Sequence, residues 1–212
     1  MNRQRGISLI VVLIALIIIS FAATALLRSV DTATLITGNL AFKKAALASG
    51  DAGSEAAIAW LTASASGTTL HSDRSADGYY ATSADACDLT GSLTPDSSAD
   101  NVAWTGTNPP ANCNMVARQA ASAGIANGFT VSYVVNRMCN AAGNPSSIFA
   151  ADGTTPMICS RSASGSDTGS TRTGAYYGNF ALTGGTQVFY RITTRVSGPR
   201  NTVRFTQTFV VL

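Results

Sequence analysis

The pattern most suggestive of metal chemistry lies at residues 73–78, Asp-Arg-Ser-Ala-Asp-Gly. Asp73, Ser75 and Asp77 place oxygen-bearing side chains at alternate positions before a glycine, as at the start of a calcium-binding loop. The pattern fails further on, because its twelfth position is Ala84, where such a loop needs a bidentate glutamate. An Asp-rich turn explains the same residues. We therefore expect a turn, and we keep calcium as the candidate cofactor.

Catalytic patterns are scarce in the sequence. The single histidine, His71, lies in a segment of Ser, Thr and Asp, where a solvated loop residue is expected. The single glutamate, Glu55, lies in an alanine-rich segment. The chain has no Gly-x-Ser-x-Gly, His-Glu-x-x-His or phosphate-binding loop motif. We predict that the protein is not an enzyme.

The longest uncharged segment covers residues 7–27, near the N-terminus. As a helix these 21 residues would span about 31 Å, the thickness of a bilayer's hydrocarbon core. Arg3 and Arg5 precede the segment, whereas Arg28 and Asp31 offset each other after it. The positive-inside rule predicts a cytoplasmic N-terminus and an exported remainder.

Three kinds of N-terminal segment fit this composition: a cleaved signal peptide, a permanent anchor and a prepilin leader. A short basic leader, then Gly6, then the apolar helix without a spacer resembles the leader of type IV prepilins and pseudopilins. This resemblance implies cleavage after Gly6 by prepilin peptidase and N-methylation of Ile7. The expected divisions are a leader (1–6), a transmembrane helix (7–27), a helical stem (28–63) and a globular domain (64–212).

The stem, residues 28–63, contains no proline and many alanines, which favours helix. Its glycines, Gly38, Gly50 and Gly53, each cost about 1 kcal/mol relative to alanine, so a local bend is expected. The side chains expected to form one buried stripe are Leu40, Leu47, Ser54, Ile58 and Leu61, with Ala57 and Trp60 beside them.

The C-terminal third alternates apolar and polar residues, which predicts strands. The expected strands are 129–137, 186–197 and 202–212, the last two joined by a turn at 198–201. The residues expected on one face of each strand are Phe129, Val131, Tyr133 and Val135 in the first, Val188, Tyr190, Ile192, Thr194 and Val196 in the second, and Val203, Phe205, Phe209 and Val211 in the third. The apolar face of an antiparallel sheet of these strands would cover the stem, giving an α+β fold. Residues 115–127 are expected to form a short helix.

Four cysteines in an exported domain favour two disulfides. Spacing favours Cys87–Cys113 and Cys139–Cys159, although four cysteines permit three pairings. Arg191, Arg195, Arg200 and Arg204 surround the last hairpin, where solvated faces and edge protection explain them. The net charge of +3 falls to +1 without Arg3 and Arg5, so no nucleic-acid partner is expected.

Further features narrow the resemblance to the PilX-type minor pilins of type IV pili. They are the ending YRITTRVSGPRNTVRFTQTFVVL, the segments VVNRMCN and ICS, and an apolar helix without an acidic residue. The resemblance covers about the first 60 and the last 85 residues. It implies a pilin-like fold and a non-catalytic subunit of the tip or initiation complex. The implied partners are other minor pilins, the major pilin, a tip adhesin and prepilin peptidase. The implied location is the inner membrane with a periplasmic domain, and later the pilus tip.

In major pilins the fifth mature residue is a glutamate, whereas here it is Val11. In the family that glutamate pairs with the N-terminal amine of the subunit above. A subunit with valine there loses nothing at a filament tip, where no subunit lies above it. Two alternatives stay open: a K-type minor pseudopilin of type II secretion, which usually carries an inserted helical domain, and a membrane-anchored exported binding protein.

Overall fold

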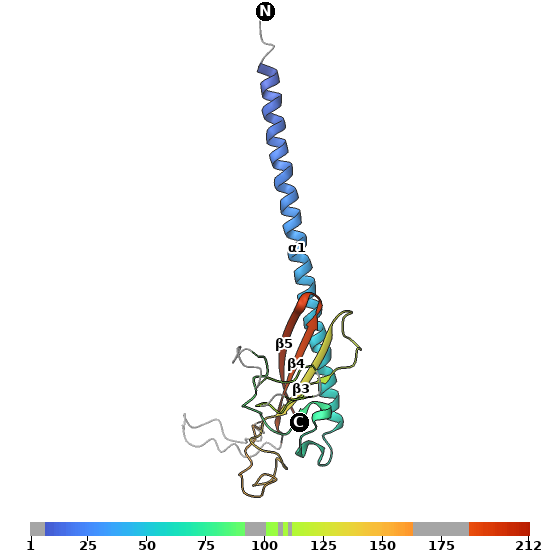
Figure 1. Ribbon diagram of the computed structural model, residues 1–212, viewed down its shortest axis with the longest axis vertical. Coiled ribbons are helices and arrows are strands. Elements are labelled where there is room, and N and C mark those ends of the chain that lie inside the picture. Colours follow the sequence, from blue (N-terminus) through green and yellow to red (C-terminus); the bar gives the residue numbers. More distant parts are fainter. Residues whose placement is uncertain (1–6, 92–100, 106–107, 110–111, 163–186) are drawn as a thin grey trace, which may run out of the picture. The chain divides into compact units, whose positions relative to one another are not determined.

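The computed structural model describes residues 7–91, 101–105, 108–109, 112–162 and 187–212 (Figure 1). They divide into two compact units, one ending at Ala45 and the other running from Ala46 to Leu212. The boundary between the two units falls inside a helix. The elements are α1 (Ile7–Ala63), β1 (Tyr79–Tyr80), β2 (Arg118–Gln119), β3 (Thr130–Arg137), β4 (Phe189–Gly198) and β5 (Thr202–Val211), with short 3-10 turns at Thr69–His71, Ser75–Asp77 and Pro199–Asn201.

Helix α1 runs without interruption for 57 residues and ends at Ala63, where the stem was expected to end. Several of its hydroxyl side chains bond to the backbone of the same helix; for example, Thr32 Oγ1 donates to the carbonyl of Arg28 at 2.9 Å. Gly38, Gly50 and Gly53 do not end it. The absence of proline keeps the backbone hydrogen-bond ladder continuous.

The sheet has the order β1-β3-β4-β5, with β2 also paired to β3. β2, β3, β4 and β5 pair antiparallel, and the β4–β5 hairpin turns through Pro199–Asn201. The α+β fold, with a long N-terminal helix packed on a C-terminal sheet, is therefore confirmed. The purely antiparallel sheet is a correction: β1 pairs parallel with β3, so the sheet is mixed.

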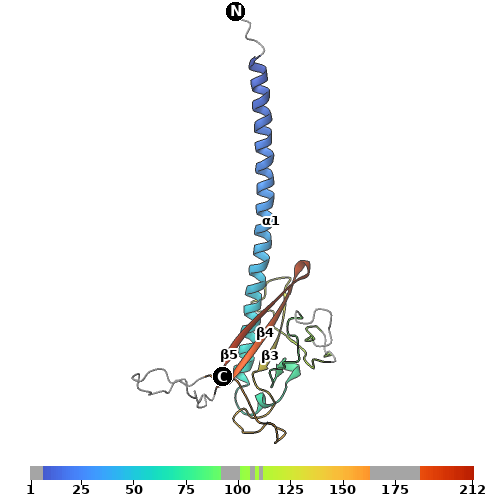
Figure 2. The ribbon, with the colours of Figure 1, turned by 90° about the vertical axis from the view of Figure 1, so that its left-hand side faces the viewer.

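The inner face of the sheet packs against residues 46–63 of α1 within the second unit (Figures 1 and 2). The fully buried side chains of this core include Val131, Val135 and Ile192 from the sheet and Leu61 from the helix. These sheet positions belong to the alternating sets that the sequence placed on one face. The prediction of that face for β3 and β4 is confirmed.

Mostly small residues of α1 form the contact with the sheet: Ala46, Ser49, Gly50, Gly53, Ser54 and Ala57 are buried, together with the larger Leu61. A Cβ added at Gly53 would lie 2.4 Å from Val131 Cγ1, and one added at Gly50 would lie 2.9 Å from Thr206 Oγ1. The helix approaches the sheet so closely that a side chain at either position would force the neighbouring side chain or the backbone to shift.

The predicted buried stripe is right from Ser54 onward and wrong at Leu40 and Leu47. Leu47 is 56% exposed and Leu40 is 49% exposed. The helix approaches the sheet most closely at Gly50 and Gly53, so the buried face is rotated toward these glycines and the two leucines lie outside it.

The apolar side chains expected on the inner face of β5 also differ from expectation, because they do not face the helix. Phe205 lies opposite Arg195 in the register, on the outer face of the sheet.

The outer face carries a second cluster, in which Val134 packs with Tyr80, Leu89, Val102, Cys113 and Met115. The predicted helix over 115–127 is wrong, because Arg118–Gln119 forms β2 and pairs with β3. Strand pairing with the sheet outweighs the local preference of these residues for helix.

Candidate functional site

Most large apolar side chains of the first unit are exposed. Every Leu, Ile, Val and Phe from Leu9 to Phe42 is exposed. Soluble monomers rarely expose contiguous apolar patches above a few hundred Å², so lipid or protein must cover this surface. By length and composition, α1 qualifies either as a membrane anchor or as an export signal.

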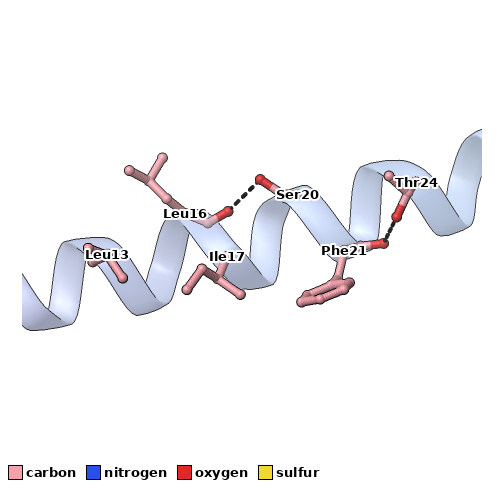
Figure 3. A pocket seen from close by; sticks show the side chains of 6 residues that line it. All are labelled: Leu13, Leu16, Ile17, Ser20, Phe21 and Thr24. Atoms are coloured by element: carbon pink, nitrogen blue, oxygen red, sulfur yellow. Dashed lines mark hydrogen bonds between the residues drawn. The ribbon is translucent and has the colours of Figure 1, made fainter.

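One face of this helix holds a shallow groove lined by Leu13, Leu16, Ile17, Ser20, Phe21 and Thr24 (Figure 3). Ser20 Oγ donates to the carbonyl of Leu16 at 2.8 Å, and Thr24 Oγ1 donates to the carbonyl of Phe21 at 2.9 Å. Both hydroxyls are therefore satisfied without water. Small and hydroxyl-bearing residues of this kind are enriched where helices pack together in lipid.

Val11 belongs to this exposed surface, and its side chain is 58% exposed. From Ile7 to Leu27 the helix carries no ionisable residue. Ile7 is the first residue of α1, whereas Gly6, the predicted cleavage position, lies outside the described residues.

The predicted calcium residues lie in a turn between α1 and β1. Asp73 Oδ1 accepts a hydrogen bond from the backbone N–H of Ala81 at 2.8 Å. Asp77 forms an ion pair with Arg118 at 2.6 Å. Ser75 begins a 3-10 turn that Gly78 ends in the left-handed region, at φ 68°. Both carboxylates thus brace this turn, and the calcium hypothesis gains no support from their arrangement.

In the part of the chain that the structure describes, no group of three or more His, Cys, Asp or Glu side chains gathers as metal ligands would.

The cysteines form disulfides with the pairing that their spacing favours, Cys87–Cys113 and Cys139–Cys159. The first lies within the outer cluster, around the buried Cys113. The second closes a loop in which the backbone N–H of Ala150 donates to the carbonyl of Thr155 at 2.8 Å.

Sequence reasoning missed Arg137, a fully buried arginine at the end of β3. Its guanidinium donates to four backbone carbonyls at 2.8–3.1 Å, those of Leu70, Ala81, Ala141 and Gly143. It thereby joins the segment after α1, the end of β1 and the Cys139–Cys159 loop. A charged residue that closes an apolar strand is the sequence signal, but only the fold brings the four carbonyls together.

Tyr79 packs beside this network. Its O–H donates to the carbonyl of Leu70 at 2.7 Å, and burial raises the pKa of its phenol. Its ring lies 5.5 Å from that of Trp60, between centroids. The network is a fixed structural centre, because buried charges persist only where hydrogen bonds satisfy them.

No protein-family model, curated protein or solved structure matches this chain.

Proposed function

We propose that the protein is a non-catalytic minor pilin of a type IV pilus, which acts in the tip or initiation complex that primes assembly. The observation that carries the proposal is the length of exposed apolar surface on α1. Within the first unit the helix rises about 50 Å from Leu9 to Phe42, well over the thickness of a hydrocarbon core. Lipid covers only part of such a surface, so the remainder needs protein.

Neighbouring helices of the same kind supply that cover in a filament. The groove from Leu13 to Thr24 and the exposed Leu35, Ile36 and Leu40 offer apolar contacts along successive turns. A permanent anchor with a separate binding domain needs no apolar surface beyond residue 27. This difference favours assembly over simple anchoring.

Val11 supports a tip position. A carboxylate at this depth costs about 2.5–3.5 kcal/mol on insertion scales unless a partner neutralises it. A subunit at the tip has no subunit above it to provide the amine. The valine avoids the unpaired charge, while the amine of Ile7 stays free for the glutamate of the subunit below.

The first test is mass spectrometry of the mature N-terminus. We expect residues 1–6 to be absent and Ile7 to be N-methylated, and we expect the full chain in a strain without prepilin peptidase. An intact Met1 in wild-type cells would contradict the proposal and leave the membrane-anchored binding protein.

The second test concerns position. Deletion should lower the number of surface pili, and immunogold labelling should mark one end of each filament. Normal piliation, or labelling along the whole shaft, would contradict a tip subunit. A secretion defect with normal pili would instead identify the K-type pseudopilin.

A further inference from the structure

The outer face of the sheet carries a row of four side chains at one level. In the register, Gln119 lies opposite Ser132, Ser132 opposite Arg195, and Arg195 opposite Phe205. Directly paired residues project to the same face of a sheet. The adjacent Val131 and Val196 belong to the core with α1, so the row points away from the helix.

A hollow of about 320 Å³ lies over this row. Its lining combines Gln119, Ser132 and Arg195 with Thr130, Trp104 and Thr105. The ring of Trp104 stands edge-on to Phe205, at 5.5 Å between centroids. Phe205, at the end of the row, therefore contacts the half-buried indole of Trp104 and holds it in place.

The polar groups of the hollow have no partners in the described part of the chain. Neither the guanidinium of Arg195 nor the side chains of Gln119 and Ser132 take part in a hydrogen bond or ion pair there. Other arginines of the same domain are engaged: Arg118 pairs with Asp77, and Arg191 donates to the carbonyl of Ser83. Donors and acceptors that lack protein partners, and that the sheet holds in fixed positions, can bind a polar ligand.

We propose that this hollow binds a sugar that carries a carboxylate, such as a uronic acid residue of an acidic polysaccharide. An indole offers an apolar surface to the C–H groups of a sugar ring. One amide and three hydroxyls match sugar hydroxyls, since each can donate and accept. The single guanidinium binds a carboxylate through two parallel hydrogen bonds.

The charge of the lining selects among ligands. Arg195 is the one charged side chain that lines the described hollow, which matches a ligand with one negative charge rather than a polyphosphate. The hydroxyl and amide floor is unsuited to an acyl chain. This site is independent of the pilin proposal and would serve equally on an anchored binding protein.

The experiment uses the full chain in phosphatidylcholine nanodiscs, because detergents with sugar headgroups would compete. Saturation-transfer NMR and tryptophan fluorescence titrations compare methyl glucuronide, methyl galacturonide, methyl glucoside and acetate. We expect at least one uronide to bind at least tenfold more tightly than the glucoside, and acetate to give no change in fluorescence. Absence of binding by both uronides would overturn the proposal. So would an equal response to acetate, which would indicate a carboxylate site without sugar recognition.

Variants assign the contacts. Arg195→Gln should remove the tenfold preference for the uronide over the glucoside, and Trp104→Ala should weaken binding of both sugars at least tenfold. Arg204→Gln removes the same charge from the opposite face of β5, and Phe209→Ala removes an aromatic ring elsewhere on the outer face; neither should change binding. Ser132→Ala tests the floor with a minimal change, and fluorescence of Trp60 verifies folding of each variant. Loss of binding in Arg204→Gln equal to that in Arg195→Gln would contradict the assignment.

Discussion

Two stretches of the same helix differ in what covers them. From Leu9 to Phe42 the large apolar side chains are exposed, whereas from Ala46 to Leu61 the buried side chains are mostly small. The small residues let the helix approach the sheet so closely that Gly53 lies against Val131. The large residues leave a surface for an environment that adapts to them, such as lipid or other helices. Side-chain size thus separates the part of α1 that packs on its own domain from the part whose apolar side chains are exposed.

The largest effect is expected from a pair of leucine truncations. Leu61 is fully buried and Leu47 is 56% exposed. Leu61→Ala should lower the free energy of unfolding of the second unit by about 2–5 kcal/mol, because it leaves a cavity in the core. Leu47→Ala should change it by less than about 0.5 kcal/mol.

Chemical denaturation followed by tryptophan fluorescence measures both variants, since Trp60 and Trp104 lie in the second unit. Equal destabilisation by the two substitutions would mean that Leu47 also packs on the domain. That result would remove the distinction between the two stretches.

Gly53→Ala should lower the free energy of unfolding by about 1–3 kcal/mol. The added Cβ would lie 2.4 Å from Val131 Cγ1, so the helix or the strand must shift. The double variant Gly53→Ala/Val131→Ala should be less destabilised than the sum of the two single variants, because the second change makes room for the first. Strict additivity in the same denaturation assay would contradict the close contact.

Gly38→Ala should have the opposite sign. Nothing lies within 4 Å of a Cβ added at Gly38. Alanine should therefore stabilise the helix locally by about 1 kcal/mol through its better helix propensity. Slower hydrogen exchange of the amides around residue 38 would show this, and the tryptophan-monitored unfolding should not change. Faster exchange at these amides would indicate that the glycine is needed there for a contact.

The smallest effect concerns pH and lies wholly in the second unit. Hydrogen bonds from the hydroxyl and N–H of Thr155 and the N–H of Thr154 lower the pKa of Asp152 from 3.8 to about 2. A lowered pKa stabilises the folded loop above pH 3.8, and this contribution is lost as the pH falls from 3.8 through about 2. NMR shifts of the Thr154 and Thr155 amides should follow this titration.

Thr155→Val removes the hydroxyl donor and should move the midpoint of the titration toward 3.8. The Asp152→Asn chain should show no titration at these amides. A wild-type midpoint that stays near 3.8 would contradict the hydrogen-bonded carboxylate.

Sequence periodicity was sufficient for the elements that depend on local pattern. The end of α1 at Ala63, the hairpin around Pro199–Asn201 and the inner face of β3 and β4 follow from helix propensity, turn residues and alternation. The pairing of Cys87 with Cys113 is the one that spacing favoured among the three that four cysteines permit. The length of the apolar segment at 7–27, which suffices to span a hydrocarbon core, also follows from composition alone. It depends only on the number of uncharged residues and on the rise per residue.

Tertiary contacts decided the rest. A hydrophobicity pattern favours Leu47 over Gly50 for a buried position, but the helix approaches the sheet at Gly50, where an added Cβ would lie 2.9 Å from Thr206 Oγ1. The composition of residues 115–127 favours a helix, but Arg118–Gln119 pairs with β3 and forms a strand instead. The carbonyls around Arg137 and the row from Gln119 to Phe205 come from segments far apart in the chain. The sequence determines which groups the chain contains and the local shape of each segment. Only folding brings distant backbone and side-chain groups within hydrogen-bonding distance.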